Sequence, residues 1–344
     1  MDTEQLAAPS RLGPALAAVT ADDRWLGVTA RLISGGKSNL TFELASAAGT
    51  LILRRPPSGH LLPSAHDMAR EARVQRALAG SVVPVPEIVL SDADGELLGV
   101  PCYVMARVEG RVIRDAVPAG YAVTAAERQA LADALVDTLA ALHAIDPAAV
   151  GLSDFGRPDG YLARQLRRWG QQWDSSATRP VPEISRLGEL LAERRPASSR
   201  AAIVHGDYKL DNCVMDARDP GLIAAVLDWE MSTLGDPLTD LGLLLFYWGT
   251  PGGPASARIV PTVTTQPGFP PRDYLAERYA RSTGVSLTEI DYYLAFANYK
   301  FAVIVAGIAA RAATGAMAGQ DFGDLGPLVL GCARDGLAIL GAGA

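Results

Sequence analysis

The sequence predicts an α+β fold with two lobes, a small lobe over residues 1–107 and a larger, mainly helical lobe over residues 108–344. A chain of 344 residues is long enough for two domains or for one large two-lobed unit. Strand-like runs separated by turn residues fill the first hundred positions, and long helical patterns follow them. The small lobe should therefore carry a mainly antiparallel sheet.

Strands and one helix are expected in the small lobe. The segment "RLISGGKSNLTFEL" reads as two strands around a Gly-Gly turn, and "TLILRRP" reads as a strand that ends at Pro56. Apolar residues near helical spacing in "AHDMAREARVQRAL" predict a helix. The segment "VPVPEIVLSDADGELLGVPCYVMARV" then predicts two strands around the "DADG" turn.

The large lobe should contain long helices whose beginnings are marked in the sequence. Thr124 with Glu127 forms a capping-box pattern, and Ser286 with Glu289 repeats it before "IDYYLAFANYKFAVIVAGIAARAA". Between these helices, "GLIAAVLDWE" reads as a strand that pairs with "NCVMD", although an isolated apolar run is also compatible with a helix. The segment "GTPGGPASARIVPTVTTQPGFPPRD" predicts a long loop.

Composition and charge exclude several classes of protein. A hydrophobic content of 49% and a charged content of 20% are ordinary for a soluble globular chain. With a net charge of -7 and a pI near 5.2, the chain lacks the basic footprint of a nucleic-acid-binding protein. The cysteines Cys102, Cys213 and Cys332 are far apart, which argues against structural disulfides and zinc and fits a reducing cytoplasm.

No membrane partner is expected either. The N-terminal residues lack the apolar region of a signal peptide. The most apolar late stretch, Phe301 to Ala310, is too short to span a bilayer and predicts a buried helix. These features together favour a cytoplasmic protein.

A dense group of polar residues, "HGDYKLDN" at positions 205–212, predicts a site for phosphoryl transfer. A tight loop can hold Asp207 toward an acceptor hydroxyl while Asn212, five residues later, turns its carbonyl oxygen toward Mg²⁺. Lys209, between them, can reach the transferred phosphoryl group. Asp228 ends the next apolar run and offers a further hard oxygen ligand to the same metal.

These residues resemble a known catalytic pattern. "HGDYKLDN" looks like the catalytic loop of protein kinases, H-R-D-x-K-x-x-N, with Gly206 in place of the arginine, and "LDWE" stands where those enzymes carry D-F-G. With "STLGDPLTDLGLLL" directly afterwards, the pattern is similar to that of the aminoglycoside phosphotransferase-like family of choline and aminoglycoside kinases. Segments such as "PCYVMARVEGRV" and "YLARQLRRW" resemble its branch of kinase-like domains fused to acyl-CoA dehydrogenases.

The resemblance implies a protein-kinase-like fold and an enzyme that transfers the γ-phosphoryl group of ATP or GTP to a hydroxyl of a small substrate, with Mg²⁺. Asp207 would be the catalytic base, and Asn212 and Asp228 the magnesium ligands. "LILR" resembles the kinase strand V-A-I-K, so Arg54 stands where the phosphate-pairing lysine usually lies, with Glu71 as its ion-pair partner. A surface salt bridge is the alternative interpretation of this pair.

The resemblance also locates the rest of the nucleotide site. "SGGKSN" would be the nucleotide loop, although Gly-Gly is also an ordinary hairpin turn. "YVMARVEG" resembles the hinge between the lobes, where adenine would bind backbone groups. The residues implied are Ser34, Gly35, Gly36, Ser38 and Asn39 in the loop, and Met105, Ala106 and Val108 in the hinge.

Several neighbours have structural interpretations. His205 should brace the catalytic loop through a hydrogen bond, and Asp240 should be a helix N-cap or a loop anchor. Glu230 and Asp236 either line the acceptor site or are solvated carboxylates, and Cys213 should be an inert strand residue.

A protein kinase and a nucleotide-binding pseudokinase are the alternative functions. The short segment from Asp228 to Asp240 argues against a protein kinase, because it leaves no room for an activation segment. Arg54 is the one departure that favours a pseudokinase. The sequence does not determine whether the acceptor is an aminoglycoside, a sugar or a hydroxyacyl compound, whether the donor is ATP or GTP, or the oligomeric state.

Overall fold

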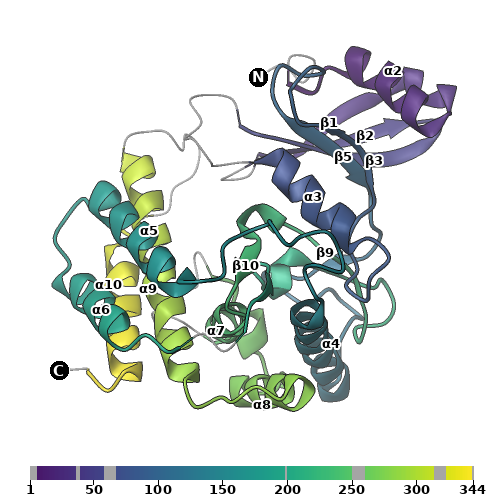
Figure 1. The fold of residues 1–344 in the computed structure, drawn as a ribbon. Helices are drawn as coiled ribbons and strands as arrows, with labels where there is room; N and C mark the ends of the chain where they lie inside the picture. The colour runs from purple at the N-terminus through teal and green to yellow at the C-terminus, as the bar shows by residue number, and fades with distance from the viewer. Residues whose placement is uncertain are drawn as a thin grey trace.

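The small lobe is built on a five-stranded antiparallel sheet in the order β1-β2-β3-β5-β4 (Figure 1). The computed structural model describes residues 6–35, 39–57, 67–197, 200–249, 260–313 and 323–342. Each expected strand of this lobe is present. They are β1 (Thr29–Gly35), β2 (Leu40–Ser46), β3 (Gly49–Arg55), β4 (Ile88–Asp92) and β5 (Cys102–Ala106).

Helices cover both faces of this sheet (Figure 1). On one face, α2 (Pro9–Thr20) packs with a cluster that includes Leu53. On the other, α3 (Met68–Leu78) packs with a cluster that includes Ile52. Because side chains alternate along a strand, Arg54 lies on the same face as Ile52, the face of α3. This alternation brings Arg54 to the large lobe, where it forms an ion pair.

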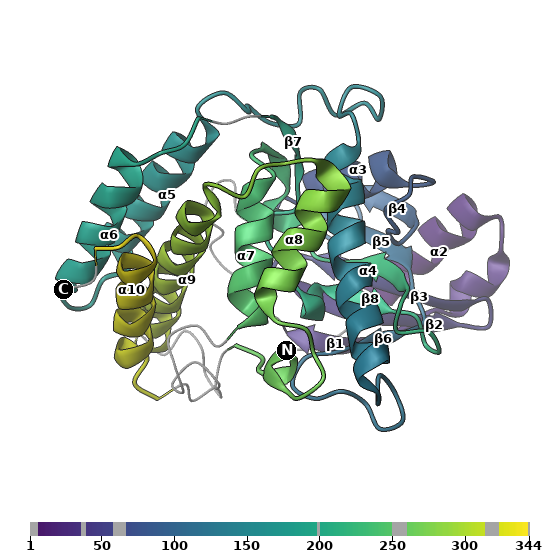
Figure 2. The ribbon, with the colours of Figure 1, turned by 90° about the horizontal axis from the view of Figure 1, so that it is seen from below.

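The large lobe is mainly helical, and Figures 1 and 2 show its helices in two groups. The first group contains α4 (Ala125–Ala144), α7 (Leu238–Trp248) and α8 (Arg272–Thr283). The second contains α5 (Tyr161–Ser176), α6 (Pro182–Glu193), α9 (Ile290–Ala313) and α10 (Gly326–Ile339). Helix α9 packs against α7 and also against α5, α6 and α10, so it joins the two groups.

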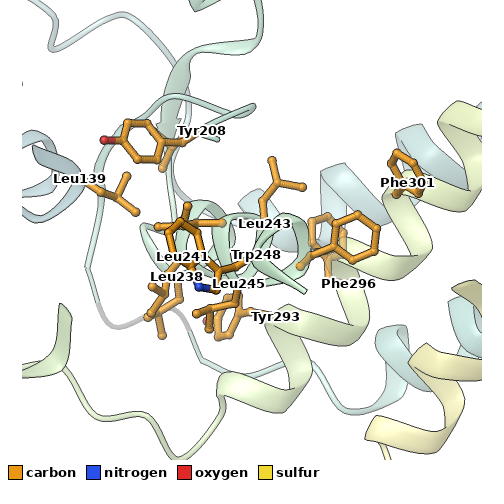
Figure 3. Packing of buried hydrophobic residues seen from close by; sticks show 14 of the residues in the cluster. Leu139, Tyr208, Leu238, Leu241, Leu243, Leu245, Trp248, Tyr293, Phe296 and Phe301 are labelled. Atoms are coloured by element: carbon orange, nitrogen blue, oxygen red, sulfur yellow. The ribbon is translucent and has the colours of Figure 1, made fainter. Parts of the chain in front are cut away.

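The core of the large lobe centres on α7, in which every residue except Tyr247 is buried. Figure 3 shows leucines of α7 packed beside Tyr293 and Phe296 of α9. A glycine lets the two helices approach closely, because a Cβ at Gly242 would lie 2.6 Å from the carbonyl oxygen of Tyr293. This tight contact makes α7 a rigid support for the chain segments that bind to its N-terminal end.

Two small antiparallel sheets of the large lobe carry the polar segments singled out above. One pairs β7 (Ala202–Val204) with β10 (Thr233–Gly235). The other has the order β6-β8-β9, with β6 (Arg111–Val112), β8 (Cys213–Met215) and β9 (Ile223–Val226). The predicted pairing of "NCVMD" with "GLIAAVLDWE" is confirmed, and residues 205–212 form the connection from β7 to β8.

The capping signals give one correct and one wrong prediction. The capping box of Thr124 and Glu127 is present in full at the start of α4. The one predicted at Ser286 and Glu289 is wrong, because α9 begins only at Ile290. Ser286 Oγ instead accepts a hydrogen bond from the amide of Thr288, so this short polar segment forms a local turn before the helix.

Two other predictions concern the late part of the chain. The expected buried helix over Phe301 to Ala310 lies within α9. Within the described ranges, α9 is the one helix long and apolar enough to cross a membrane, and 78% of its apolar window is buried inside the protein, as in a core helix. Of the predicted Pro/Gly loop, residues 250–259 lie outside the described residues, and the described remainder contains a short 3-10 helix, η5 (Val263–Thr265).

Candidate active site

The loop after β7 brings together the three residues predicted to act in it. Lys209 Nζ lies 2.9 Å from Oδ2 of Asp207. Asn212 Nδ2 donates to the same Oδ2 at 3.0 Å and to the main-chain oxygen of Asp207 at 2.8 Å. A 3-10 turn, η2 (Leu210–Asn212), closes the loop and carries Asn212 back beneath Asp207. The loop therefore holds one carboxylate between an ammonium group and an amide.

Gly206 is required by the shape of this loop. Its φ is +83°, in the left-handed region that glycine favours. A Cβ at this position would lie 2.6 Å from the main-chain oxygen of Met231. The loop thus packs directly on the segment after β9, and a larger residue could not stand here without moving one of the two.

A third cation near Asp207 was not predicted from the sequence. Lys300 of α9 is 7% exposed, and its Nζ donates to the carbonyl oxygen of Gly206. Burial by itself would raise the pKa of Asp207, but Lys209 and then Lys300 oppose it, and the pKa is lowered. Asp207 is therefore ionised at neutral pH, as a general base must be.

A signal for Lys300 did exist in the sequence. Among 31 Lys and Arg residues, only Lys37, Lys209 and Lys300 are lysines. A chain that uses arginine almost everywhere keeps a lysine within the catalytic loop and another in the middle of an apolar helix. The predicted buried helix begins at Phe301, so Lys300 received no role in the prediction.

Asp240 anchors the catalytic loop to α7. Its Oδ2 accepts from the amide of His205 at 2.6 Å, and its Oδ1 accepts from the amide of Gly206 at 2.8 Å. His143 Nε2 lies 3.3 Å from the same carboxylate. Because Asp240 lies inside α7, its prediction as an N-cap is wrong and its prediction as a loop anchor is confirmed. Burial raises the pKa of Asp240, and the hydrogen bond from His143 helps to lower it overall.

His205 braces the loop as predicted. Its Nδ1 accepts from the amide of Asp207 at 3.2 Å, so Nε2 carries the proton and donates to the carbonyl oxygen of Leu227 at 2.9 Å. Complete burial lowers the pKa of His205, despite the nearby Asp240. The neutral ring thereby links the catalytic loop to the strand end that carries Asp228.

Asp228 faces Arg54 across the two lobes. Arg54 Nη2 donates to Oδ1 of Asp228 at 3.0 Å. The backbone of Asp228 has φ +66°, a left-handed conformation that costs free energy in a residue other than glycine and that often marks functional sites. The amide of Leu227 donates to the carbonyl oxygen of Asn212 at 2.8 Å, which ties Asp228 to the catalytic loop.

The donor set fits a magnesium ion. Asn212 uses its Nδ2 on Asp207, so its carbonyl oxygen remains for a metal, and Asp228 supplies a carboxylate. Among the residues the structure describes, no three His, Cys, Asp or Glu side chains gather as a metal cage. Mg²⁺ suits such a sparse set, because it takes one or two protein oxygens and completes its shell with phosphates and water.

The pair of Arg54 and Glu71 is buried, so its interpretation as a surface salt bridge is wrong. Arg54 Nη2 lies 3.6 Å from Glu71 Oε2, and the two side chains are 11% and 1% exposed. Tyr103 also donates to Glu71, at 2.9 Å. Burial raises the pKa of Glu71, and Arg54 only partly offsets it. Arg54 Nε is buried without a hydrogen-bond partner in the described part of the chain.

Only part of the predicted nucleotide loop can be placed. Gly36 and Ser38 lie outside the described residues, and Ser34 and Gly35 end β1, where Gly35 pairs with Leu40 of β2. Asn39 is buried, and its Nδ2 lies 3.1 Å from both Glu71 Oε1 and Glu230 Oε2.

Two carboxylates near the catalytic loop, Glu230 and Asp236, were predicted either to line the acceptor site or to be solvated. Both form hydrogen bonds with protein groups. Glu230 meets Asn39 across the lobes. Asp236 is 1% exposed and accepts a hydrogen bond from the hydroxyl of Tyr293 at 2.8 Å, so it is not solvated. Cys213 lies buried in β8, and burial raises its pKa to about 12, in agreement with an inert strand residue.

The predicted hinge begins within the sheet. Met105 and Ala106 end β5, and the amide of Ala106 donates to the carbonyl oxygen of Glu87 at 2.8 Å. Val108 follows in the extended connection to β6. The amide of Ala106 is therefore already occupied by Glu87.

Comparison with known proteins identifies relatives of this chain. Residues 29–273 match the model of the phosphotransferase enzyme family. The chain is 35% identical over 314 residues to acyl-CoA dehydrogenase family member 11 of Homo sapiens, covering 88% of this chain and 39% of that protein. It is 33% identical to family member 10 of Mus musculus, covering 81% and 26%. The chain thus spans at most about two fifths of the length of these relatives.

Solved structures share the fold. A candidate aminoglycoside phosphotransferase from Ralstonia eutropha JMP134 is 32% identical, with a TM-score of 0.78 over 92% of this chain and 93% of that chain. A thermostable mutant of aminoglycoside phosphotransferase APH(4)-Ia, in complex with AMP-PNP and hygromycin B, is 16% identical, with a TM-score of 0.62 over 97% and 99%. The predicted kinase-like fold and the predicted family are both confirmed. The chain belongs to the phosphotransferase enzyme family.

Proposed function

We propose that the chain is a small-molecule kinase that transfers the γ-phosphoryl group of ATP or GTP to a hydroxyl of a small acceptor, with Mg²⁺. One observation carries the proposal: the loop that holds Asp207, Lys209 and Asn212 is joined to the ion pair of Asp228 and Arg54 by the hydrogen bond from the amide of Leu227 to the carbonyl oxygen of Asn212. A structural neighbour in complex with AMP-PNP and hygromycin B supports a nucleotide donor and a hydroxyl-bearing acceptor.

Asp207 is the group that accepts the proton of the acceptor hydroxyl. Lys209 and Asn212 both bind its Oδ2, and among the described residues no hydrogen bond reaches Oδ1. The acceptor hydroxyl therefore has an ionised oxygen to bind. The cations that lower the pKa of Asp207 keep this oxygen charged, and the packed loop fixes its direction.

The cations of the site stabilise negative charge on the donor. Lys209 lies beside Asp207, where it would contact the transferred phosphoryl group. Burial lowers the pKa of Lys209, but Asp207 raises it, so Lys209 stays protonated. Arg54 is positioned by Glu71 and Asp228 to bind the α- and β-phosphates with its planar guanidinium. When bound at Asn212 and Asp228, Mg²⁺ would supply further neutralisation of the phosphate oxygens.

Adenine or guanine would bind where the small lobe passes into the large one. The amide of Ala106 already donates to Glu87, so the amide of Val108 is the donor that we assign to the base. This assignment agrees with our division of the chain into lobes at residue 107, which we retain as a proposal.

Replacing the base gives the direct test. Asp207→Asn keeps the size of the side chain, so it should lower turnover about 10²- to 10⁴-fold, the usual contribution of a general base, with nucleotide binding nearly unchanged. Amino sugars, sugars and hydroxyacyl compounds would be incubated with Mg-ATP and Mg-GTP, and products would be identified by mass. Asp159→Asn, an exposed carboxylate on a loop before α5, is the matched control.

Two results would contradict the proposal in different ways. Unchanged turnover in Asp207→Asn would remove Asp207 from the role of base. A wild-type chain that binds Mg-nucleotide but phosphorylates no member of the panel would favour the pseudokinase.

A further inference from the structure

Tyr247 is the one residue of α7 that is only partly buried, and its ring lies beside the catalytic loop. The ammonium nitrogen of Lys209 lies over this ring, 4.9 Å from its centroid. The same nitrogen lies 2.9 Å from Oδ2 of Asp207. Lys209 therefore has two partners, a carboxylate in its own loop and an aromatic face on the core helix.

Aromatic neighbours on two helices hold the ring of Tyr247 in place. Phe246 of α7 lies 5.2 Å from it between ring centroids, and Phe301 of α9 lies 5.9 Å from it, both edge to face. Partial burial raises the pKa of Tyr247, so its phenol stays neutral. The contact with Lys209 is therefore a cation–π interaction with a fixed ring and not an ion pair.

A second partner for Lys209 matters because the charge of Asp207 changes during the proposed reaction. Asp207 takes the proton of the acceptor hydroxyl, whose oxygen bonds to the γ-phosphorus while the bond from phosphorus to the nucleoside diphosphate breaks. Asp207 is then a neutral carboxylic acid, and its ion pair with Lys209 is lost. The ring of Tyr247 takes no part in this proton transfer, so it still binds the ammonium group at the end of a long, flexible side chain.

We propose that Tyr247 is a positioning residue for phosphoryl transfer, and that its ring holds the ammonium group of Lys209 beside the transferred phosphoryl group throughout the step. The inference rests on the proposed function and adds to it a residue of the core helix. A cation–π contact changes an equilibrium about 2-fold when exposed and about 30-fold when shielded from water. The side chain of Lys209 is 17% exposed, so we expect an effect in the upper part of that range.

The kinetic test is a double-mutant cycle between Tyr247 and Lys209. Tyr247→Leu should lower kcat about tenfold with little change in KM for Mg-ATP, and Tyr247→Phe, which keeps the ring, should retain most of the lost kcat. When Lys209→Met has already removed the ammonium group, Tyr247→Leu should cause no further loss. Phe246→Leu is the matched control, because no cation lies over its ring among the described residues. Its effect on kcat should be the same with and without Lys209.

NMR of the lysine side chains measures the contact without any substrate. The chain has three lysines, Lys37, Lys209 and Lys300, so isotopic labelling of lysine gives three Cε signals, and Lys209→Met assigns one of them. The ring current of Tyr247 should shift the Cε protons of Lys209 upfield in the wild type and in Tyr247→Phe, and not in Tyr247→Leu. The signal of Lys300, which lies 5.6 Å from the centroid of the Trp169 ring, is the internal control and should stay in place.

The two measurements separate this inference from the proposed function. A Lys209 signal that depends on the ring, in a chain that phosphorylates nothing, would support positioning by Tyr247 and refute the kinase. A Lys209 signal that is indifferent to Tyr247→Leu would overturn the positioning, whether or not the chain is a kinase. Equal losses of kcat with and without Lys209 would also overturn it, because the ring would then act by packing alone. Tyr247→Met, whose flexible side chain fills irregular gaps, replaces Tyr247→Leu in both measurements if the leucine variant does not fold.

Discussion

At the scale of single residues, the charge of Asp207 depends on side chains from near and distant parts of the chain. Lys209 and Asn212 are local, and their spacing was enough to predict that they would meet Asp207. Lys300 comes from a helix more than ninety residues later. Its contribution depends on how α9 packs against the loop, and no local pattern encodes that packing.

The pH dependence of activity tests this electrostatic setting. An ordinary aspartate has a pKa of about 3.9, and Lys209 and Lys300 lower the value for Asp207 against the effect of burial. A lowered pKa in the folded state stabilises the fold above the ordinary pKa, and that contribution is lost as the pH falls through the lowered value. The acid limb of kcat should therefore lie below about pH 4.

Removing one cation should move that limb in a known direction. Burial raises the pKa of Asp207, and the charge of Lys300 helps to lower it. Lys300→Met removes that charge, so the pKa of Asp207 should rise and the acid limb should shift to higher pH. Arg281→Gln, an exposed cation at the end of α8, is the control and should leave the profile unchanged. The pH–rate profiles of the three proteins give the measurement, and an unshifted limb in Lys300→Met would contradict the assignment.

At the scale of elements, the catalytic loop is held by the helix beneath it. Asp240 of α7 accepts hydrogen bonds from two consecutive amides of the loop, and Gly206 packs against the segment after β9. The strands on either side of the loop were predictable, because turn residues and apolar runs are local signals. The role of α7 as an anchor was open, since an aspartate near a helix start is also a common N-cap.

Gly206→Ala tests how tightly the loop is packed. The positive φ costs about 1 kcal/mol or more for any residue with a side chain, and the contact of the new Cβ with the main-chain oxygen of Met231 adds about 1–3 kcal/mol. Gly120→Ala is the control, because its φ is +74° but a Cβ there has nothing within 4 Å. Denaturant unfolding should show a clearly larger loss for Gly206→Ala, and equal losses would mean that the loop can move away.

The wrong helix start at Ser286 shows where local signals fail. The pattern of Ser286 and Glu289 is the same as that of Thr124 and Glu127, which does form a capping box. In the failed case the serine hydroxyl binds the amide two residues later, and the chain turns once more before α9 begins. Both outcomes use the same donor and acceptor groups, so tertiary packing decides between them.

At the scale of the whole molecule, polar contacts cross between the lobes around the candidate site. Arg54 binds Asp228, and Asn39 binds Glu230. Arg70 of α3 donates to the carbonyl oxygen of Ser232. The two-lobed architecture was predictable from the change in pattern near residue 107. The contacts between the lobes were only partly predictable, because the resemblance suggested roles for Arg54 and Asp228 without showing that they pair directly.

Asp228→Ala should weaken nucleotide binding and loosen the contact between the lobes together. It removes the proposed oxygen ligand of the metal and the partner of Arg54, so the affinity for Mg-nucleotide should fall at least about tenfold by calorimetry. Asp154→Ala is the control, since it breaks a second ion pair between the lobes, Arg73 with Asp154, which is exposed and worth about 0–1 kcal/mol. Equal affinities in wild type and Asp228→Ala would exclude Asp228 as a ligand.

The anchoring of the catalytic loop to α7 has an evolutionary consequence. The loop of residues 205–212 is hydrogen-bonded to Asp240 in the interior of the core, and a small cavity behind Gly206 is lined by residues of α5, α7 and α9. Helix α9 also holds the loop, through Lys300, but the residues of α5 that line this cavity make no hydrogen bond to residues 205–212 in the described part of the chain. Descendants of one ancestral chain can therefore vary the α5 side of the cavity while the loop keeps its position.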